Sequence, residues 1–217
     1  MTNMAQPARE GAGDEGGAGS APRPEVVGLV LAAGGGRRLG GRPKALLEHG
    51  GRTLAEHAVG TLRAGGVGRV HVVVGAAASA VRALPGLADC VLVENPAWQE
   101  GMGTSLRAGL DSLGDTGATA ALVLLVDQPG ITSEAVARVR EAVEGPAVLA
   151  AATYDGRRGH PVLLGADHWR PAADSAEGDR GARAYLARHS AALALVPCDG
   201  VAAPYDIDVP ADLDRLD

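Results

Sequence analysis

Aromatic side chains are scarce in this sequence, and phenylalanine is missing altogether. Aromatic residues make up 2% of the 217 residues, too few for the stacking platform with which single-strand nucleic-acid binders hold bases. Positive charge is also in the minority, with 20 Lys and Arg against 26 Asp and Glu and a formal net charge of -6. Binding to a phosphate backbone needs clustered Lys and Arg instead. Nucleic acid is therefore not expected as a partner.

Cysteine is scarce too. Cys90 and Cys198 lie far apart in the sequence, so neither a CxxC element nor a disulfide framework is expected. No stretch approaches the roughly 18 continuous apolar residues of a membrane span, and the N-terminus lacks the apolar region of a signal peptide. We expect two free thiols in a cytoplasmic protein that has no membrane partner.

Glycine and proline are abundant instead, with 32 and 13 residues, and they are dense at the N-terminus. Residues 1–24 are mostly Gly, Ala, Pro and charged residues without an apolar period. Such a composition does not bury enough apolar surface to fold. We predict a flexible tail over 1–24 and one folded domain over 25–217, which is long enough to bury a substantial core.

From Val26 onward, apolar runs of strand length alternate with segments of helical periodicity. Continuous apolar runs are typical of strands buried on both faces, and the most hydrophobic run, 120–126, is expected to be the central strand. The other predicted strands are 26–33, 70–74, 90–93 and 147–152. One predicted helix starts at the Thr53–Glu56 capping box and stops at Gly65 and Gly66, a second, short helix ends at Leu84, and two more cover 104–113 and 133–143. This alternation predicts an α/β layer fold with a mostly parallel sheet.

The rhythm changes after residue 155. An extended or hairpin segment is predicted at 157–165, followed by a helix at 181–189. Strands at 192–196 and 205–209 are expected to complete the sheet, and Pro210 to lie in the first turn of a terminal helix.

A glycine-rich loop follows the first predicted strand, and in an open parallel sheet ligands bind beyond the carboxyl ends of the strands. Gly34, Gly35 and Gly36 let backbone N–H groups surround an anion, while Arg37 and Lys44 supply positive charge. This chemistry suits a polyphosphate, although a surface turn in a glycine-rich protein explains the same residues. The P-loop pattern fails because no Ser or Thr follows the lysine, and the dinucleotide fingerprint fails because leucine replaces its third glycine.

Carboxylates follow two other predicted strands. Asp127 stands at the tip of the central strand, where its desolvation must be offset by a cation or by hydrogen-bond donors; the alternative is a cap for the next turn. Asp206 and Asp208 alternate along a late strand, which puts them on one face. Carboxylate oxygens are the ligands that Mg²⁺ prefers. These three aspartates are the candidate ligands for Mg²⁺ or, alternatively, Mn²⁺.

Six segments, in order from about Val26 to the end of the chain, resemble the MobA-like nucleotidyltransferases. The loop 31–40, followed by Pro43 and Lys44, is similar to the family signature. The other similar segments, which resemble the molybdenum cofactor cytidylyltransferase branch, are 95–106, 127–129, 159–162, 178–183 and 206–213. The resemblance covers the whole predicted domain.

The resemblance implies a Rossmann-like three-layer nucleotidyltransferase fold, a nucleoside triphosphate donor and a divalent metal ion. The implied nucleotide-binding residues are Leu31, Ala32, Ala33, Gly34, Gly35, Gly36, Arg37, Lys44, Gly101 and Ser105. The implied acceptor-binding residues are His160, Gly181 and Arg183. Two positions depart from the family pattern: Gly36 stands where relatives often carry a small hydroxyl residue, and Leu39 where methionine is common.

The expected chemistry is attack of an acceptor phosphate on the α-phosphorus of the donor, with pyrophosphate leaving. Both reactants are anions, so the catalyst mainly positions them and neutralises charge. We predict that Arg37 and Lys44 stabilise the pyrophosphate and that Asp127 holds the metal. No general base is needed, which makes His160 a positioning residue or an ordinary turn histidine. Arg183 either reaches the acceptor phosphate or lies in solvent.

The expected reaction is cytidylyl transfer from CTP to a molybdopterin-type cofactor, whose product serves a molybdoenzyme. The Leu31–Gly34 sequence favours this branch, because the guanylyl-transferring branch resembles Leu-Ala-Gly-Gly there. The alternatives are guanylyl transfer, transfer to a sugar phosphate or another small phosphorylated acceptor, and a non-catalytic chaperone that carries a cofactor. Loss of an acidic motif would favour the chaperone, and both motifs are intact.

Overall fold

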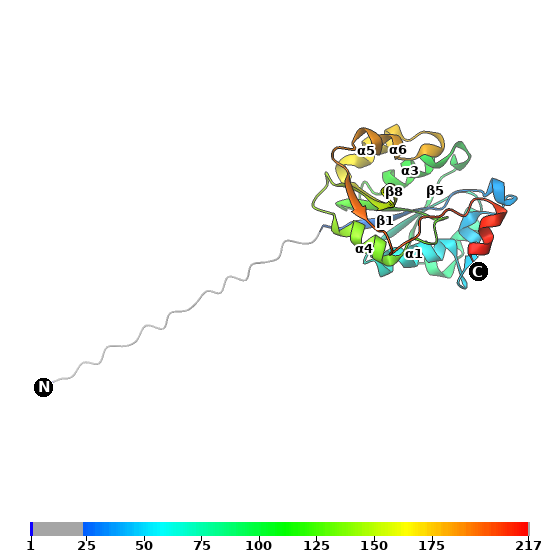
Figure 1. Ribbon diagram of the computed structural model, residues 1–217, viewed down its shortest axis with the longest axis horizontal. Coiled ribbons are helices and arrows are strands. Elements are labelled where there is room, and N and C mark those ends of the chain that lie inside the picture. Colours follow the sequence, from blue (N-terminus) through cyan, green and yellow to red (C-terminus); the bar gives the residue numbers. More distant parts are fainter. Residues whose placement is uncertain (2–23, 217) are drawn as a thin grey trace.

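A seven-stranded sheet forms the centre of the computed structural model, which describes Met1 and residues 24–216 (Figure 1). The strand order is β5-β4-β1-β6-β8-β7-β9. The strands are β1 (Val26–Leu31), β4 (Val70–Val74), β5 (Val91–Glu94), β6 (Ala120–Leu125), β7 (Leu149–Tyr154), β8 (Arg157–Gly165) and β9 (Ala194–Pro197). The predicted tail over 1–24 lies, apart from its two end residues, outside the described part of the chain.

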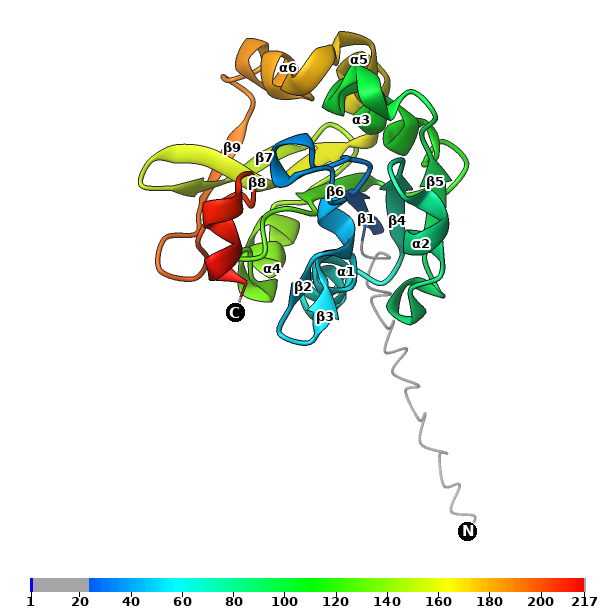
Figure 2. The same cartoon turned by 90° about the vertical axis from the view of Figure 1, so that its right-hand side faces the viewer.

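The sheet is mostly parallel, as predicted. Only β8 runs against its neighbours β6 and β7, and β6 is the central strand of the order. Because β8 is antiparallel, its first residues, Arg157 to His160, lie at the sheet edge where β1 and β6 end. The hairpin that joins β7 and β8 projects beyond the helices in Figure 2. One edge of the sheet therefore gathers the carboxyl ends of the parallel strands and the start of β8.

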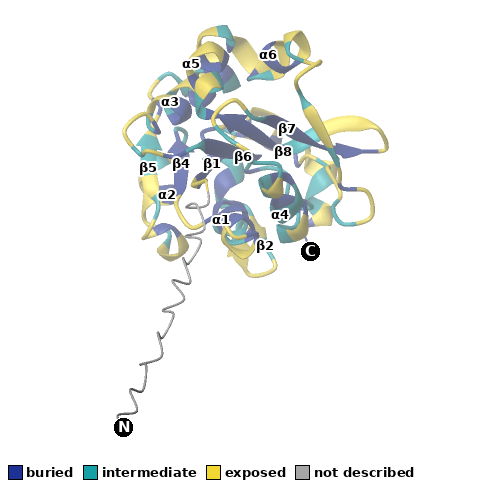
Figure 3. Ribbon diagram, turned by 90° about the vertical axis from the view of Figure 1, so that its left-hand side faces the viewer, coloured by how far each residue is buried: buried dark blue, intermediate teal, exposed yellow. Residues whose placement is uncertain are grey.

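Helices cover both faces of the sheet, which gives the three layers (Figures 1 and 3). On one face lie α1 (Leu54–Ala64) and α4 (Ser133–Glu141); on the other lie α3 (Met102–Asp111), α5 (Ala166–Ser175) and α6 (Arg183–Arg188). A short helix, α2 (Ala78–Arg82), follows β4, and β2 (Glu48–His49) pairs with β3 (Arg52–Thr53) in a small separate hairpin. The predicted α/β layer fold is confirmed.

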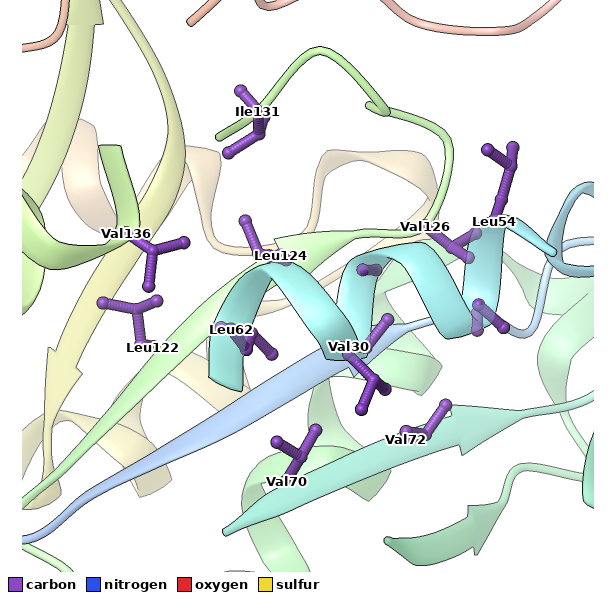
Figure 4. Packing of buried hydrophobic residues seen from close by; sticks show 14 of the residues in the cluster. Val30, Leu54, Leu62, Val70, Val72, Leu122, Leu124, Val126, Ile131 and Val136 are labelled. Carbon is purple, nitrogen blue, oxygen red and sulfur yellow. The ribbon is translucent and has the colours of Figure 1, made fainter. Parts of the chain in front are cut away.

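The position of the central strand β6 between two layers of helices explains why its sequence is apolar throughout. Leu122 and Leu124 pack into the core beneath α1 and α4, where Figure 4 shows them beside Val30 and Val136. Ala121 and Val123 alternate with them and pack into the core on the α3 side. A strand covered on both faces has no solvent side, so no polar alternation is visible in its sequence.

The capping box at the start of α1 is confirmed. The Thr53 hydroxyl accepts a hydrogen bond from the Glu56 N–H, and the Thr53 N–H donates to the Glu56 carboxylate at 3.1 Å. Helix α3 instead begins at Met102, two residues before the predicted start. Thr104 is already inside the first turn, where its hydroxyl bonds back to the Ala97 and Gly101 carbonyl groups.

Other boundaries shift by small amounts. Helix α6 begins at Arg183 rather than 181, because 178–180 form a separate 3₁₀ turn that ends at Gly181. A 3₁₀ helix spans Pro210–Arg215, with Pro210 at its start as predicted. Cys90 and Cys198 are both free. No described helix is long and apolar enough to cross a membrane.

The strand predicted at 205–209 is wrong. The segment is irregular, and the Ile207 N–H donates to the Asp127 carbonyl, just beyond the end of β6, at 2.9 Å. Both edges of β6 are already paired, with β1 and with β8, so the segment cannot join the sheet beside it. Burial of the Ile207 side chain holds the segment across the end of the strand.

Candidate active site

A cavity of about 1600 Å³ lies at the edge of the sheet where β1 and β6 end. Its walls are the glycine-rich loop, the segment 98–106, the hairpin between β7 and β8, the segment 179–186 and the acidic segment 204–208. Every predicted site residue except Ala32 lines this cavity. Five segments spread over the whole domain thus converge on one space.

Ala32 is the exception because it continues the alternation of β1. Its side chain is 1% exposed and packs in the core beneath α1, and its N–H donates to the Val73 carbonyl in the sheet. Leu31 and Ala33 belong to the opposite face and line the cavity. The structure therefore does not bring Ala32 to the site.

The glycine-rich loop folds back on itself around Gly36. The Gly36 carbonyl accepts hydrogen bonds from the N–H groups of Leu39 and Gly41, and its φ of 60° lies in the left-handed region that favours glycine. A Cβ atom here would come within 1.8 Å of the Arg42 carbonyl oxygen. The hydroxyl side chain that relatives often carry cannot be placed on this backbone unless the loop moves.

An ion-pair cluster joins the loop to both acidic motifs. The Lys44 ammonium lies 2.6 Å from Oδ2 of Asp127 and also contacts Oδ1 of Asp208. Arg38, which sequence reasoning left without a role, contacts the other oxygen of Asp208 at 3.2 Å. The residues predicted to hold phosphate and those predicted to hold metal are therefore neighbours.

The cluster shifts the acid–base equilibria of two of its members. Burial lowers the pKa of Lys44, but the charge of Asp127 and the hydrogen bonds to both aspartates outweigh burial and raise it above its usual value. Burial raises the pKa of Asp206, and the charges of Asp127 and Asp208 raise it further against a hydrogen bond from Gln128. Lys44 is thus held in its charged form.

Gln128 connects the two acidic motifs and was not predicted as a site residue. Its Nε2 donates to Oδ1 of Asp206 at 2.8 Å, while its Oε1 is buried without a hydrogen-bond partner among the described residues. Nothing in the sequence indicates that Gln128 and Asp206, 78 positions apart, pair.

The segment 95–105 forms the wall next to the glycine-rich loop. The amide of Asn95, which is buried, donates to the hydroxyls of Thr104 and Ser105 and so fixes the start of α3. The Trp98 ring lies against Gly35, where a Cβ atom would be 2.8 Å from it. The glycine at position 35 is the signal in the sequence for this close approach.

The part of the cavity wall formed by β8 and the start of α6 carries positive charge. Arg158 and His160 are two residues apart on β8, and Gly181 and Arg183 face the same space from the start of α6. Burial lowers the pKa of His160 to about 4; the charges of Arg183 and Arg158 lower it too, and Asp206 opposes them. His160 is therefore neutral near pH 7, and the hydroxyl of Tyr154 donates to its carbonyl at 2.7 Å.

The acidic residues offer the oxygen donors that a hard divalent cation prefers. Within the described residues, no three His, Cys, Asp or Glu side chains form a closed metal site. Asp127 and Asp208 nevertheless converge on a single cation, the Lys44 ammonium. Their chemistry and convergence fit a divalent cation once Lys44 has turned away.

Comparison with known proteins identifies the family. The sequence model of the MobA-like NTP transferase domain matches residues 28–193. The chain belongs to this family. It is a nucleotidyltransferase of the MobA-like type, as the resemblance implied, and the matched region contains the glycine-rich loop, Asp127 and the residues predicted to bind the acceptor, His160, Gly181 and Arg183.

Relatives of this MobA-like chain carry two kinds of name. Nicotine blue oxidoreductase of Paenarthrobacter nicotinovorans is 38% identical and covers 91% of this chain and 99% of its own. A molybdenum cofactor guanylyltransferase of Cereibacter sphaeroides is 32% identical and covers 88% of this chain and 95% of its own.

Among solved structures, Rv0371c of Mycobacterium tuberculosis has a TM-score of 0.74 and is 30% identical, over 89% of this chain and 97% of its own. A manganese complex of Rv0371c has a TM-score of 0.71 at 29% identity, over 88% of this chain and 97% of its own. These likenesses support the fold, and the second structure holds manganese in Rv0371c.

Proposed function

We propose that this MobA-like enzyme transfers a cytidylyl group from CTP to the phosphate of a molybdopterin-type cofactor and releases pyrophosphate. The observation that carries the reaction class is the cluster of Lys44, Asp127 and Asp208 beside the glycine-rich loop. Phosphate-binding and cation-binding groups meet there at the edge of a large cavity. The product would pass to a molybdoenzyme.

The donor triphosphate binds along the glycine-rich loop. Backbone groups from Gly34 to Gly36 face it, and Arg37 and Lys44 neutralise the charge of the departing pyrophosphate. Asp127 and Asp208, with Asp206, would hold a divalent cation, Mg²⁺ or Mn²⁺. When bound, the cation supplies charge neutralisation between the two anionic reactants.

The acceptor phosphate binds at the wall of the cavity formed by β8 and the start of α6. Arg158 and Arg183 form no ion pair within residues 24–216, so both are available for an anion. His160, on whose ring both arginines act, stays neutral and serves as a positioning residue. The acceptor phosphate is already ionised near neutral pH, so the chain needs no general base and its residues align the attack.

The choice of CTP rests on the Leu31–Gly34 sequence and on the 95–106 segment, which resemble the cytidylyl branch. Guanylyl transfer is the alternative, favoured by the name of the Cereibacter relative. Hydrogen bonds discriminate bases strongly, because the wrong base leaves buried polar groups unpaired at about 1–3 kcal/mol each. Ala33 and Gly34, which line the cavity, carry the backbone groups that would read the base.

Pyrophosphate release, measured with CTP and GTP in the presence and absence of molybdopterin, tests this proposal. We expect release that needs molybdopterin and is at least roughly tenfold faster with CTP, a difference of about 1.4 kcal/mol. Faster release with GTP would place the chain in the guanylyl branch. Activity with neither would point to another phosphorylated acceptor or to a cofactor-carrying chaperone.

A redox function is the second candidate, favoured by the 38% identity to a protein named nicotine blue oxidoreductase over 99% of that protein. Mixing the protein with nicotine blue and a reduced nicotinamide dinucleotide distinguishes the two. Bleaching of the dye without any nucleotidyl transfer would support the oxidoreductase. Pyrophosphate release without a reductant supports the transferase.

A further inference from the structure

Lys44 occupies the point at which the two acidic motifs meet. Its side chain is 15% exposed and that of Asp127 is 18% exposed, so the pair is largely shielded from solvent. The same ammonium contacts Asp208, which is 42% exposed. Arg38 reaches only Asp208 and is 73% exposed. Among the described residues, Lys44 is therefore the shared counter-ion of both carboxylates.

The backbone of Lys44 is fixed, whereas its side chain has room to turn. Lys44 is the first residue of a 3₁₀ turn, and its carbonyl accepts a hydrogen bond from the Leu47 N–H. The next residue, Ala45, is fully buried. The side chain lines the same cavity as Gly34 to Arg37. Four rotatable bonds let its ammonium exchange the carboxylates for a phosphate without any backbone movement.

A divalent cation bound by Asp127 and Asp208 would use the oxygens that now contact Lys44. A compact ammonium cannot stay in contact with these oxygens beside a doubly charged ion, because like charges at that distance repel strongly. The departing ammonium needs a new anionic partner. A triphosphate along the glycine-rich loop is an anion within the same cavity.

We propose that Lys44 holds the place of the divalent cation in the metal-free protein and moves to the triphosphate when the cation binds, so that cation and nucleotide bind cooperatively. This inference rests on the proposed function, because it takes Asp127 and Asp208 as cation ligands. Cation binding frees Lys44 for the phosphates, and the phosphates draw Lys44 away from the carboxylates. Thermodynamic linkage requires the two effects to be equal.

Mn²⁺ binding to the full chain, followed by electron paramagnetic resonance, tests the inference without any turnover. We expect the wild type to bind Mn²⁺ weakly alone and at least roughly tenfold more tightly with the α,β-methylene analogue of CTP. Lys44→Gln should bind Mn²⁺ alone at least about tenfold more tightly than the wild type, because the competing ammonium is gone. The same analogue should then improve Mn²⁺ affinity by a smaller factor.

Two further variants separate occupancy of the site from general electrostatics. Arg38→Gln also removes a positive charge next to Asp208, yet it should change Mn²⁺ affinity by less than about threefold. Lys44→Arg keeps the charge and should retain weak Mn²⁺ binding. Thermal unfolding of each variant shows that it is folded, and Mn²⁺ should raise the melting temperature of Lys44→Gln more than that of the wild type.

Equal Mn²⁺ affinity in wild type and Lys44→Gln would overturn the proposed role of Lys44, but it would not contradict the assignment of Asp127 and Asp208 as cation ligands. Equal gains in Lys44→Gln and Arg38→Gln would do the same, because they would reflect net charge alone. Absence of Mn²⁺ binding to the wild type even with the nucleotide analogue would overturn the ligand assignment itself. If Lys44→Gln does not fold, Lys44→Arg with strong nucleotide-independent Mn²⁺ binding would contradict the proposal.

Discussion

The ammonium of Lys44 lies 2.6 Å from the carboxylate of Asp127, although 83 residues separate them in the sequence. The loop after β1 supplies the lysine and the end of β6 supplies the aspartate. These strands are paired over their whole length, from Val26 with Ala120 to Leu31 with Leu125. Adjacent parallel strands thus bring to one point the loop proposed to bind phosphate and the carboxylate proposed to hold the cation.

Asp127→Asn should lower turnover by at least about 100-fold, because it removes a carboxylate that neutralises charge between two anions. The structure adds a stability effect, since Asp127 also pairs with the shielded Lys44. Losing that charge should cost about 1 kcal/mol, or roughly 2–4 °C in melting temperature. Asp89→Asn, at an exposed position outside the cavity, serves as the control. Full activity of Asp127→Asn with Mg²⁺ would show that Asp127 is not a ligand of the cation.

Gly36→Ser should destabilise the protein, although relatives often carry a hydroxyl residue there. A left-handed backbone costs a residue with a Cβ about 1–2 kcal/mol, and the Cβ would also clash with the Arg42 carbonyl. Gly34→Ala is the matched control in the same loop, because nothing lies within 4 Å of its Cβ position. Thermal unfolding should show a clear loss for Gly36→Ser and little change for Gly34→Ala. Equal melting temperatures would mean that the loop adopts another conformation.

Arg158→Gln and Arg183→Gln should each raise the KM for molybdopterin about tenfold while leaving the KM for CTP unchanged. A charge-assisted hydrogen bond to a phosphate contributes about 1.5–3 kcal/mol, and 1.4 kcal/mol corresponds to tenfold. Arg138→Gln removes a half-buried arginine outside the cavity that pairs with Glu134 on α4 and should change neither constant. A rise in the KM for CTP instead would assign these arginines to the donor.

His160→Gln should make stability less sensitive to acid. The pKa of His160 is about 4 in the folded protein against 6.5 for an ordinary histidine. Between these values the unfolded chain binds more protons than the folded protein, so stability is present above about pH 6.5 and is lost as the pH falls towards 4. Asp206, Arg158 and Arg183 are the charged groups that act on the ring. Urea unfolding across this window should show a smaller acid loss in the variant; identical losses would mean that the pKa of His160 is not lowered in the folded protein.

The periodicity of the sequence predicted most of the fold. The central strands bury continuous apolar runs and the helices bury one apolar face, and both patterns are visible in the sequence. It also predicted that Asp127 ends the central strand. Alternation along β1 could have excluded Ala32, since Leu31 and Ala33 share the face that reaches the cavity. Alternation along β8 could likewise have added Arg158, which stands two residues before His160.

Contacts between residues that are distant along the chain could not be predicted from the sequence. The segment 205–209 has the alternation of a strand, but both edges of β6 are already paired, so it crosses the end of that strand. The pairing of Lys44 with Asp208 spans 164 positions, and that of Arg38 with Asp208 spans 170. Only the folded chain shows that these charges neutralise one another.

The position of the label after turnover with CTP tests the central claim most directly. Parallel reactions with CTP labelled at the α-phosphate and at the γ-phosphate are run with molybdopterin and Mg²⁺. Nucleotidyl transfer predicts that the α-label becomes attached to molybdopterin and that the γ-label leaves in pyrophosphate. An α-label that stays in free nucleotide, with the γ-label released as inorganic phosphate, would contradict the proposed function.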